Sequence, residues 1–354
     1  MAISAKLVKE LREMTGVGMM ECKKALTETD GDLEAAVEVL KKAGAVKAEK
    51  KASRIAAEGI TRVAKDGNTE VVVEVNSETD FVAKNATFQE FVQSVADKAL
   101  SMDIEKAGDG EDVVNILGMK AALDEKILTI GEKLSIRRFE KVTGDCVSSY
   151  IHGGGKIGVL VAGKGVSDAE EALKNIALQV ASMNPQYISR SDIDPAEIAK
   201  MREITIDAAL NDPFSLPKPI LNGLLAKAVD GVWSASEVAI YNEKKSNMNY
   251  LPNFLSDESK AQLAALAMAD KETIVTNKIF NGLVEGRVSK QLKEICLMDQ
   301  TYVKAEDGKQ SVAAYLKSVN PALSVSKFVR YEVGEGMQKK QEDFAAEVAA
   351  QMGK

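Results

Sequence analysis

Residues 1–44 show the periodicity of three short helices separated by polar or glycine-containing breaks. Ser4 can cap the first helix, and Gly16 interrupts the pattern after it. We expect Gly44 to end the third helix, and the Ala- and Lys-rich residues 45–58 to form a helical linker with a solvated basic face. The apolar positions recur at helical spacing: Leu7, Leu11 and Met14; Met20, Cys22, Ala25 and Leu26; Leu33, Ala36, Val37 and Leu40. Such a small module has only a marginal core.

Between residues 56 and 143 the apolar residues first alternate as in strands, then recur at helical spacing, and finally alternate again. Val71, Val73 and Val75 alternate with other residues, as in a strand. Asp66-Gly67-Asn68 precedes them and favours a hairpin turn. The expected elements are strands at 59–63 and 69–76, helices at 86–100 and 113–130, and a strand at 134–142. The helix at 86–100 has its apolar stripe at Phe88, Phe91, Val92, Val95 and Ala99.

A weaker copy of this strand–helix–strand unit follows. Residues 156–162 read as a strand, Ser167 to Glu170 has the spacing of a capping box, and residues 328–333 read as a closing strand. Arg138-Phe139-Glu140 in the first closing strand matches Arg330-Tyr331-Glu332 in the second. We therefore predict two duplicated half-domains. The helix of the second copy has its apolar positions at Leu173, Ile176, Ala177, Val180 and Ala181.

Residues 189–300 interrupt the second copy. Pro195–Asn211 and Lys271–Lys293 read as an outgoing and a returning helix, with Asp212–Asp270 between them. The returning helix has apolar positions at Ile274, Ile279, Leu283 and Val288. The aromatic residues of the excursion favour a small local core over a ligand pocket, and a partner surface stays open. They are Phe214, Trp233, Tyr241, Tyr250 and Phe254.

The composition excludes several classes of protein. The 354 residues exceed one compact core, and the 45% hydrophobic and 28% charged content is typical of soluble globular modules. No apolar stretch approaches the ~20 residues of a membrane helix, and no signal-peptide pattern is evident. The net charge of −7 argues against a large nucleic-acid footprint. The dispersed Cys22, Cys146 and Cys296 predict free thiols in a reducing cytosol, without a disulfide framework or zinc site.

The sequence also lacks the side-chain groupings of common enzymes. His152 is the one histidine, and no nucleophile–base grouping or phosphate-binding loop is readable. The glycines at 153–155 precede a strand, whereas a phosphate cradle needs glycines that lead into a helix N-terminus. We read them as a tight turn. We expect no enzymatic activity, cofactor or metal, and an enzyme that relies on His152 alone is a weak alternative.

The run 78–85 lies between a predicted strand and a predicted helix. Phe81 precedes Phe88 by seven residues, so an early helix start would put both rings on one face. Lys84 interrupts that stripe, and spacing alone leaves Phe81 either buried or exposed. Asp80 is either a helix N-cap or a polar group at an exposed turn.

Met19 and Met20 follow the first break in the chain. Neighbouring residues on a helix point about 100° apart, so both side chains cannot face one small core. The pattern alone favours one methionine in the core and the other incidental. The alternative is an adaptable apolar contact surface.

The run Thr79–Lys84 resembles the signature of the elongation factor Ts family, the nucleotide exchange factors of elongation factor Tu. The N-terminal runs Leu7–Arg12 and Thr15–Leu26 resemble the same family. Further matches lie at 136–138, 152–154, 157–160, 284–287, 330–336 and 343–348. These runs follow the family's order along nearly the whole chain, so the resemblance is more specific than any single motif.

The resemblance implies an α+β fold. Its parts are an N-terminal three-helix ubiquitin-associated-like domain, a duplicated α+β core with small antiparallel sheets, an inserted antiparallel helical arm and a C-terminal helix. Residues 212–270 depart from this plan, because they exceed the simple arm turn expected of the family. The implied ranges are 1–55 for the first domain with its linker, 56–143 for the first core half, 144–188 and 301–334 for the second half, 189–300 for the arm and 335–354 for the C-terminal helix.

The resemblance also implies guanine nucleotide exchange on elongation factor Tu in the cytoplasm. The turn Asp80-Phe81-Val82-Ala83 would enter the GTPase domain, where Phe81 would act as a wedge that disturbs the Mg²⁺ site. Asp80 would add a polar contact without binding metal. The further implied contacts are Thr79, Arg12, Met19, Met20, His152, Gly153 and Phe344. The rival function is a scaffold or chaperone-like binder that uses residues 189–300, and self-association through the arm stays open.

Overall fold

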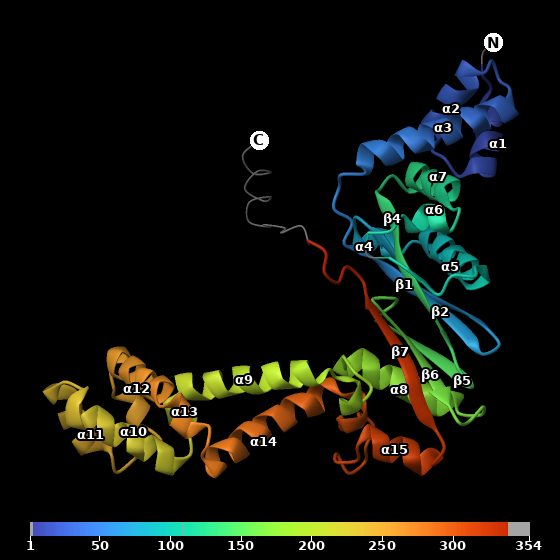
Figure 1. The fold of residues 1–354 in the computed structure, drawn as a ribbon. Coiled ribbons are helices and arrows are strands. Elements are labelled where there is room, and N and C mark those ends of the chain that lie inside the picture. The colour runs from blue at the N-terminus through green and yellow to red at the C-terminus, as the bar shows by residue number, and fades with distance from the viewer. Residues whose placement is uncertain (1–2, 109, 339–354) are drawn as a thin grey trace. The chain divides into compact units, whose positions relative to one another are not determined.

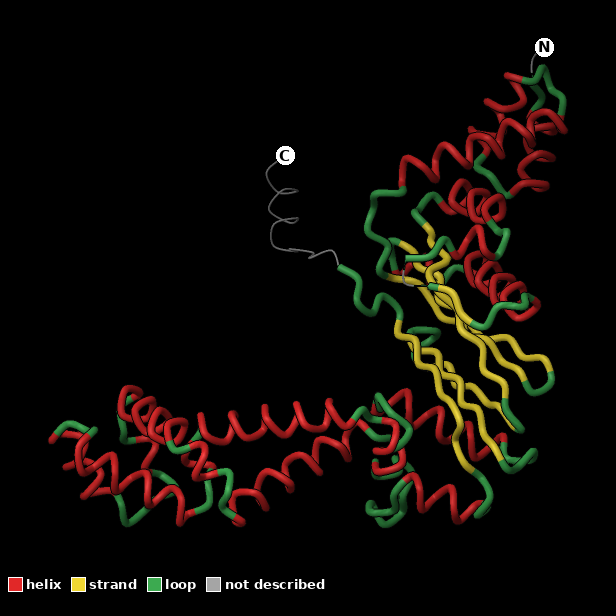
Figure 2. The backbone as a smooth tube through the Cα atoms, viewed as in Figure 1, coloured by secondary structure: helices red, strands yellow, loops and turns green. Residues whose placement is uncertain are grey.

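The computed structural model describes residues 3–108 and 110–338. The contacts divide the chain into two units: unit 1 comprises residues 1–184 and 302–354, and unit 2 comprises residues 185–301. Figure 2 shows two small sheets in unit 1, whereas unit 2 consists of helices and loops. This mixture confirms the predicted α+β class. Most of the predicted C-terminal helix, including Phe344, lies outside the described residues.

Three helices form the N-terminal module, as predicted (Figure 1). They are α1 (Ala5–Thr15), α2 (Met19–Glu28) and α3 (Leu33–Lys51). Ser4 Oγ accepts the Leu7 N–H at 3.2 Å, and Gly16 ends α1 with φ of 67°. Met14 was predicted in the apolar stripe but is 61% exposed. The buried residues of this module, with one from α7, are Val8, Leu11, Val17, Cys22, Ala25, Leu26, Ala36, Leu40 and Leu128.

Helix α3 continues through Gly44, so the predicted helix end at that residue is wrong. A Cβ atom at Gly44 would lie 3.0 Å from the backbone oxygen of Asp124 in α7 (Lys120–Ile130). The glycine therefore permits close packing of α3 on α7 rather than capping the helix. Much of the predicted linker becomes the last turns of α3, which fixes the N-terminal module to the first core half.

The first core half contains a four-stranded antiparallel sheet in the order β1-β2-β4-β3. The predicted hairpin, the helix at 86–100 and the closing strand are confirmed. The single helix predicted at 113–130 is wrong, because Gly118, with φ of 65°, separates two helices. The elements are β1 (Glu58–Asp66), β2 (Thr69–Ser77), α4 (Asp80–Ala83), α5 (Ala86–Ser101), β3 (Lys106–Ala107), α6 (Val113–Ile116), α7 and β4 (Leu134–Thr143).

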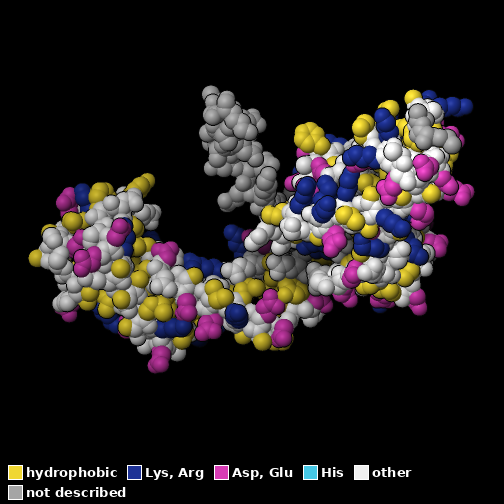
Figure 3. Space-filling model, turned by 90° about the horizontal axis from the view of Figure 1, so that it is seen from above, with side chains coloured by type: hydrophobic (Ala, Val, Ile, Leu, Met, Phe, Trp, Pro, Cys, Tyr) yellow, Lys and Arg dark blue, Asp and Glu magenta, His cyan; other side chains and the backbone are white. Residues whose placement is uncertain are grey.

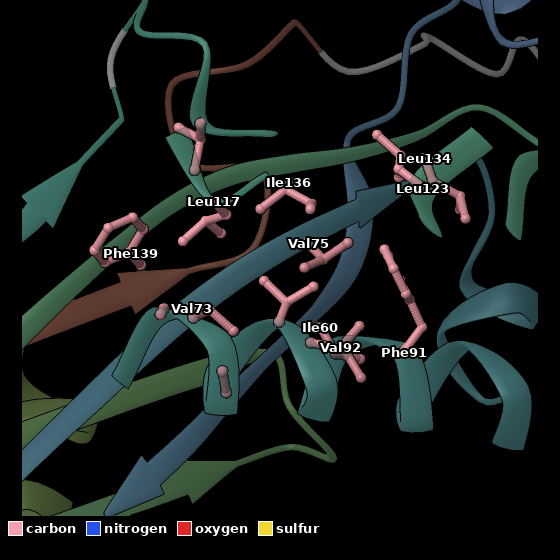
Figure 4. Close-up of a cluster of buried hydrophobic side chains, with 14 of the residues drawn as sticks. Ile60, Val73, Val75, Phe91, Val92, Leu117, Leu123, Leu134, Ile136 and Phe139 are labelled. Atoms are coloured by element: carbon pink, nitrogen blue, oxygen red, sulfur yellow. The ribbon is translucent and has the colours of Figure 1, made fainter. Parts of the chain in front are cut away.

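The core of this half lies between the sheet and its helices. Figure 4 shows Val73 and Val75 of β2 in one cluster with Phe91 and Val92 of α5. All five residues of the predicted α5 stripe are buried. The odd-numbered valines of β2 thus face α5, as period-two alternation requires.

The second core half repeats this topology with the three-stranded antiparallel sheet β5-β6-β7. In both halves a hairpin leads to a helix and then to a strand that pairs with the second hairpin strand, as the predicted duplication requires. The capping box at Ser167 to Glu170 is wrong, because Ala169 is the N-cap and no side chain caps the helix. The predicted apolar stripe is buried, but the sequence reading missed β5. The elements are β5 (Cys146–His152), β6 (Ile157–Lys164), α8 (Glu170–Met183), α15 (Val312–Val319) and β7 (Ser324–Glu332).

The two sheets pack face to face within unit 1. A Cβ atom at Gly158 of β6 would lie 2.8 Å from Thr61 Oγ1, so this close approach requires glycine. The Thr61 N–H also donates to the Gly155 carbonyl at 2.7 Å. The apolar cluster between the sheets consists of Val72, Val142, Val147, Leu160, Ala162, Val329 and Tyr331.

Unit 2 is an antiparallel helical arm with additional helices between its long members. The predicted outgoing helix is confirmed, but the returning one is interrupted at Asn277, whose side chain caps α14 through the Ile279 and Phe280 N–H groups. Ile279 is 56% exposed, contrary to its predicted apolar role. The α-helices are α9 (Pro195–Asn211), α10 (Lys218–Gly231), α11 (Ala235–Lys244), α12 (Asp257–Ala269), α13 (Lys271–Ile274) and α14 (Lys278–Ile295). Short 3₁₀ turns lie at Arg190–Asp192, Pro213–Ser215, Leu251–Asn253 and Leu297–Asp299.

The aromatic residues of unit 2 divide between its core and its surface. Trp233 is 7% exposed, and its Nε1–H donates to the Ser259 carbonyl at 3.0 Å, so the predicted local core is present. Tyr250 and Phe254 are instead 60% and 49% exposed. No helix among the described residues is long and apolar enough to cross a membrane.

A buried carboxylate joins the two core halves. Glu74 of β2 is inaccessible to solvent and accepts hydrogen bonds from Arg138 Nε at 2.6 Å and Arg137 Nη1 at 3.0 Å. It also accepts the Gly334 N–H at 2.9 Å, just beyond β7 of the second half. The guanidinium group of Arg138 lies 4.1 Å from the Tyr331 ring centroid. Burial disfavours the charge of Arg138, but Glu74 together with the smaller effects of Tyr331 and Glu335 outweighs it, so the pKa of Arg138 is raised.

Substitution of Glu74 tests whether this carboxylate stabilises the contact between the two core halves. Glu74→Ala is expected to destabilise unit 1 by about 3–5 kcal/mol, because Arg137 and Arg138 lose their buried counter-charge. Hydrogen exchange of the β2 and β4 amides measures the loss locally. In the control Glu335→Ala, which removes a half-exposed partner of Arg138, the change should stay within about 1 kcal/mol. Equal effects of the two substitutions would contradict the role given to Glu74.

Candidate partner-binding site

The chain after β2 forms the single helical turn α4 and exposes Phe81. The Phe81 side chain is 79% exposed, whereas Val82 and Ala83 are each 9% exposed. These two residues belong to the apolar core of the first half. The spacing of apolar residues left the exposure of Phe81 open, and the structure places the ring outside. Burial of the next two residues anchors the turn that carries it.

A carboxylate from another loop holds the start of this turn. Glu132 Oε2 accepts the Thr79 N–H at 3.0 Å, and Glu132 Oε1 accepts the Thr79 hydroxyl at 2.6 Å. Glu132 follows Gly131, which ends α7 with φ of 87°. Sequence reasoning missed Glu132, since a lone glutamate in a loop 53 residues from Thr79 has no recognisable spacing.

Glu78 and Lys133, the residues next to Thr79 and Glu132, are also hydrogen-bonded to each other. Glu78 Oε1 accepts the Lys133 N–H at 2.5 Å and lies 3.2 Å from Arg54 Nη1. Lys133 Nζ donates to the carbonyls of Ala52 and Arg54 at 2.6 and 2.7 Å. The β2–α4 connection, the α7–β4 loop and the chain after α3 are therefore tied together. Several charge-assisted hydrogen bonds hold the base of the turn, while its apex stays exposed.

Asp80 carries a negative charge beside the Phe81 ring. Its carboxylate accepts from Lys84 Nζ at 2.7 Å, and Lys84 Nζ lies 5.9 Å from the Phe81 ring centroid. The hydrogen bond from Lys84 lowers the pKa of Asp80, with a smaller favourable effect from the charge of Lys156. Thr79 occupies the N-cap position of α4, so the N-cap alternative for Asp80 is wrong.

A shallow hollow lies beside Phe81. It measures about 290 Å³ and is lined by Phe81, Val82, Asn85, Thr87, Thr129 and Ile130. The exposed ring and this hollow form one convex–concave surface, which suits contact with another macromolecule better than enclosure of a small ligand.

The N-terminal module exposes a second group of predicted contact residues. Met19 and Met20 are 51% and 66% exposed, and Arg12 is also exposed. The interpretation that one methionine belongs to the core is therefore wrong, because Cys22 of the same helix is buried there instead. A hollow of about 390 Å³ beside Met20 is lined by Met20, Lys23, Lys24, Thr27 and Glu28.

The predicted residues of the second core half lie at the exposed turn between β5 and β6. His152 and Gly153 are exposed, and all three glycines of this turn have positive φ. Tyr150 Oη lies 3.1 Å from His152 Nδ1. The glycine-rich segment is a tight turn before a strand, as predicted. Phe344 lies outside the described residues.

The predicted residues that the structure describes lie in three separate regions of unit 1, namely the N-terminal module, the turn at α4 and the turn between β5 and β6 (Figure 1). Figure 3 shows scattered hydrophobic side chains between charged ones on the visible face of this unit. Within residues 3–108 and 110–338, no group of three or more His, Cys, Asp or Glu side chains could hold a metal ion.

Comparisons with known proteins agree with the motifs. The family model described as "Elongation factor TS" matches residues 78–253 and 235–335. The chain is also 40% identical to the elongation factor Ts of Clostridioides difficile (strain 630) over 366 aligned positions. That alignment covers 99% of each chain. The family match begins at Glu78, the residue at the base of the exposed turn.

The carboxylate of Glu132 can be tested as the support of this turn. Glu132→Gln removes a charge-assisted acceptor of Thr79 and should weaken local closure by about 1.5–3 kcal/mol. Hydrogen exchange of the amides of residues 79–84 should then be about ten- to hundredfold faster. Glu125→Gln on exposed α7 surface is the matched control and should leave these amides unchanged. Unchanged exchange in Glu132→Gln would exclude the support role.

The charge state of Asp80 gives a pH-dependent prediction. Its folded-state pKa is lowered, so the contact with Lys84 is present at neutral pH and is lost as the pH falls through that pKa. In Lys84→Met the pKa of Asp80 should rise towards its ordinary value, as measured by the carboxyl carbon shift in NMR titrations. Asp257, whose pKa Lys260 lowers, is the internal control and should not change. An unaltered Asp80 titration would show that Lys84 does not set its pKa.

Proposed function

The chain belongs to the elongation factor Ts family of translation elongation factors, the exchange factors of elongation factor Tu, and from this premise we propose that it promotes release of GDP from elongation factor Tu so that GTP can bind. The single observation that carries the proposal is the exposed Phe81 ring on a firmly held turn. A phenyl ring that is 79% exposed contributes little to this chain's own core.

The proposed mechanism is non-covalent. A GTPase holds its nucleotide largely through Mg²⁺ and backbone contacts to the phosphates. A protein that binds best when those contacts are disrupted weakens nucleotide binding, and the nucleotide weakens its binding reciprocally. The chain therefore acts without being an enzyme and needs no cofactor or metal of its own.

Phe81 is the proposed wedge. Burial of its ring between elements of the GTPase domain would contribute roughly 1.5–3 kcal/mol, which would offset distortion near the Mg²⁺ site. The hollow beside the ring can receive a side chain of the partner. Preorganisation matters here, because a mobile ring would lose part of this free energy in becoming ordered.

The other residues of the turn have different proposed parts. Asp80, which accepts a hydrogen bond from Lys84, would supply a polar contact next to Phe81 and is not a metal ligand. Val82 and Ala83 are buried, so their part is to anchor the turn in the core of this chain. Thr79 connects this turn to Glu132 through two hydrogen bonds.

The remaining contacts spread over unit 1. Met19 and Met20, with Arg12 nearby in sequence, would bind the GTPase domain through an adaptable apolar surface. His152 and Gly153, at the exposed β5–β6 turn, would contact another domain of elongation factor Tu. Phe344, predicted by resemblance, would add a contact from the C-terminal segment. Dispersed contacts allow GTP to expel the factor stepwise, since no one contact carries all the binding free energy.

Replacing the wedge is the decisive experiment. With Phe81→Ala, release of a fluorescent GDP analogue from elongation factor Tu should be about ten- to hundredfold slower than with the unmodified chain, as 1.5–3 kcal/mol of barrier lowering is lost. Stopped-flow fluorescence at several concentrations of the chain measures this rate. The stability of the chain itself should change by no more than about 0.5 kcal/mol, since the ring is exposed.

Phe254→Ala provides a matched control, because it removes an exposed phenyl ring from unit 2. Its effect on GDP release should be small. Binding without acceleration of GDP release, or a larger effect of Phe254→Ala than of Phe81→Ala, would overturn the proposal. That outcome would favour the rival function, a scaffold or chaperone-like binder that acts through residues 189–300.

A further inference from the structure

Arg62 lies on β1, an edge strand of the first sheet, and its side chain is half-buried. A guanidinium group has five N–H donors. In Arg62 the nearest acceptor is the Thr61 carbonyl, 3.4 Å from Nη1, which is a weak contact within the same strand. Among residues 3–108 and 110–338, no carboxylate forms an ion pair with Arg62. This cation is therefore held partly out of water without a counter-charge.

The pKa of Arg62 reflects this imbalance. Burial lowers it, because a partly buried guanidinium group loses hydration that no neighbouring group replaces. Arg138 of the same sheet shows the usual arrangement, since burial acts on it too but Glu74, with smaller effects of Tyr331 and Glu335, raises its pKa. Buried charges normally have such partners. The packing of this chain alone therefore gives no reason for a cation at position 62.

The backbone places Arg62 beside the turn that joins β5 and β6. The Thr61 N–H donates to the Gly155 carbonyl of that turn at 2.7 Å. A Cβ atom at Gly155 would lie 3.2 Å from Arg62 Nη1, so the absence of a side chain there lets the turn lie against the guanidinium group. The same turn exposes His152 and Gly153, two of the proposed contacts with elongation factor Tu.

The turn that carries Phe81 lies on the same part of the molecule. Helix α4 packs on β1, the strand of Arg62. Lys156, which follows the glycines of the β5–β6 turn, is close enough for its charge to lower the pKa of Asp80 in α4. Strand β1 therefore contacts both proposed contact regions, and a partner that touches both turns passes over Arg62.

We infer that Arg62 binds a carboxylate side chain of elongation factor Tu and adds a charged contact between the Phe81 turn and the β5–β6 turn. The inference rests on the exchange function proposed above. A carboxylate accepts two parallel N–H groups of a guanidinium group, and such bidentate pairs are among the strong hydrogen bonds of proteins. Part of the desolvation of this cation has already occurred in the free chain, so less of it remains to oppose binding.

The dissociation constant of the full chain and nucleotide-free elongation factor Tu, measured by surface plasmon resonance, tests this contact. Arg62→Met keeps an apolar stem without the charge and should weaken binding about tenfold, chiefly through faster dissociation. Arg62→Lys keeps the charge but loses the two parallel donors and should weaken binding about threefold. The matched control is Arg202→Met in unit 2, where the arginine already pairs with Glu285, and its effect should stay below about twofold.

Two further measurements separate a contact with the partner from a structural role. The loss of affinity in Arg62→Met should shrink from about tenfold to about threefold as salt rises from about 0.05 to about 0.5 M, because salt screens the charge. The urea midpoint of Arg62→Met should be no lower than that of the unmodified chain, because no ion pair within the chain is lost. A lower midpoint with unchanged affinity would give Arg62 a structural role and overturn the inference.

The remaining outcomes are also decisive. If Arg62→Met fails to fold by circular dichroism, Arg62→Lys decides, and an unchanged dissociation constant overturns the inference. A loss seen with GDP-bound but not with nucleotide-free elongation factor Tu would indicate a contact with a nucleotide phosphate and would overturn it as well. If both Arg62 variants bind like the unmodified chain while Phe81→Ala slows GDP release, this inference fails and the exchange proposal stands. Absence of binding by the unmodified chain overturns both.

Discussion

The buried carboxylate of Glu74 is the constraint on which unit 1 depends. It lies on β2, an inner strand of the first sheet, pairs with two arginines of β4 and accepts a backbone N–H from the chain just after β7. A buried charge is tolerated only where such partners are in place. The two core halves must therefore pack in one relative position, in which the chain that follows β7 lies beside Glu74.

Hydrogen bonds to carboxylates also hold the exposed turn that carries Phe81. Phe81 faces solvent because Val82 and Ala83 are buried beneath it and because Glu132 holds Thr79 through two hydrogen bonds. The reciprocal contact of Glu78 with Lys133 strengthens the base. An exposed ring on a restrained base can deliver its burial free energy to a partner with little ordering cost. Residues that stabilise the chain and the residue proposed to act on elongation factor Tu are thus neighbours in one short segment.

Local sequence pattern predicted most elements, and its errors share a cause. The strand at Val71–Val75 and the helix at Phe88–Ala99 followed from periodicity, because one face of each packs on a core. Gly44 has the pattern of a helix end, but in the structure it lies within α3 and permits close packing on Asp124. Met14, Met20 and Ile279 were placed in apolar stripes but lie exposed. Helical spacing identifies the apolar face of a helix. Which residues of that face are buried depends on how far the neighbouring element that packs against it extends.

The sequence by itself determined the family, the duplicated halves and the prominence of the run Thr79–Lys84, because these are written in contiguous residues and in motif order. Only the tertiary structure decided that Phe81 is exposed, that Glu132 supports its turn, and that Glu74 joins the halves. It also brought Glu70 of the first core half and Glu170 of the second to the same side chain, that of Lys65. The physical reason is that hydrogen bonds and burial depend on distances between residues remote in sequence, and local periodicity carries no record of those distances.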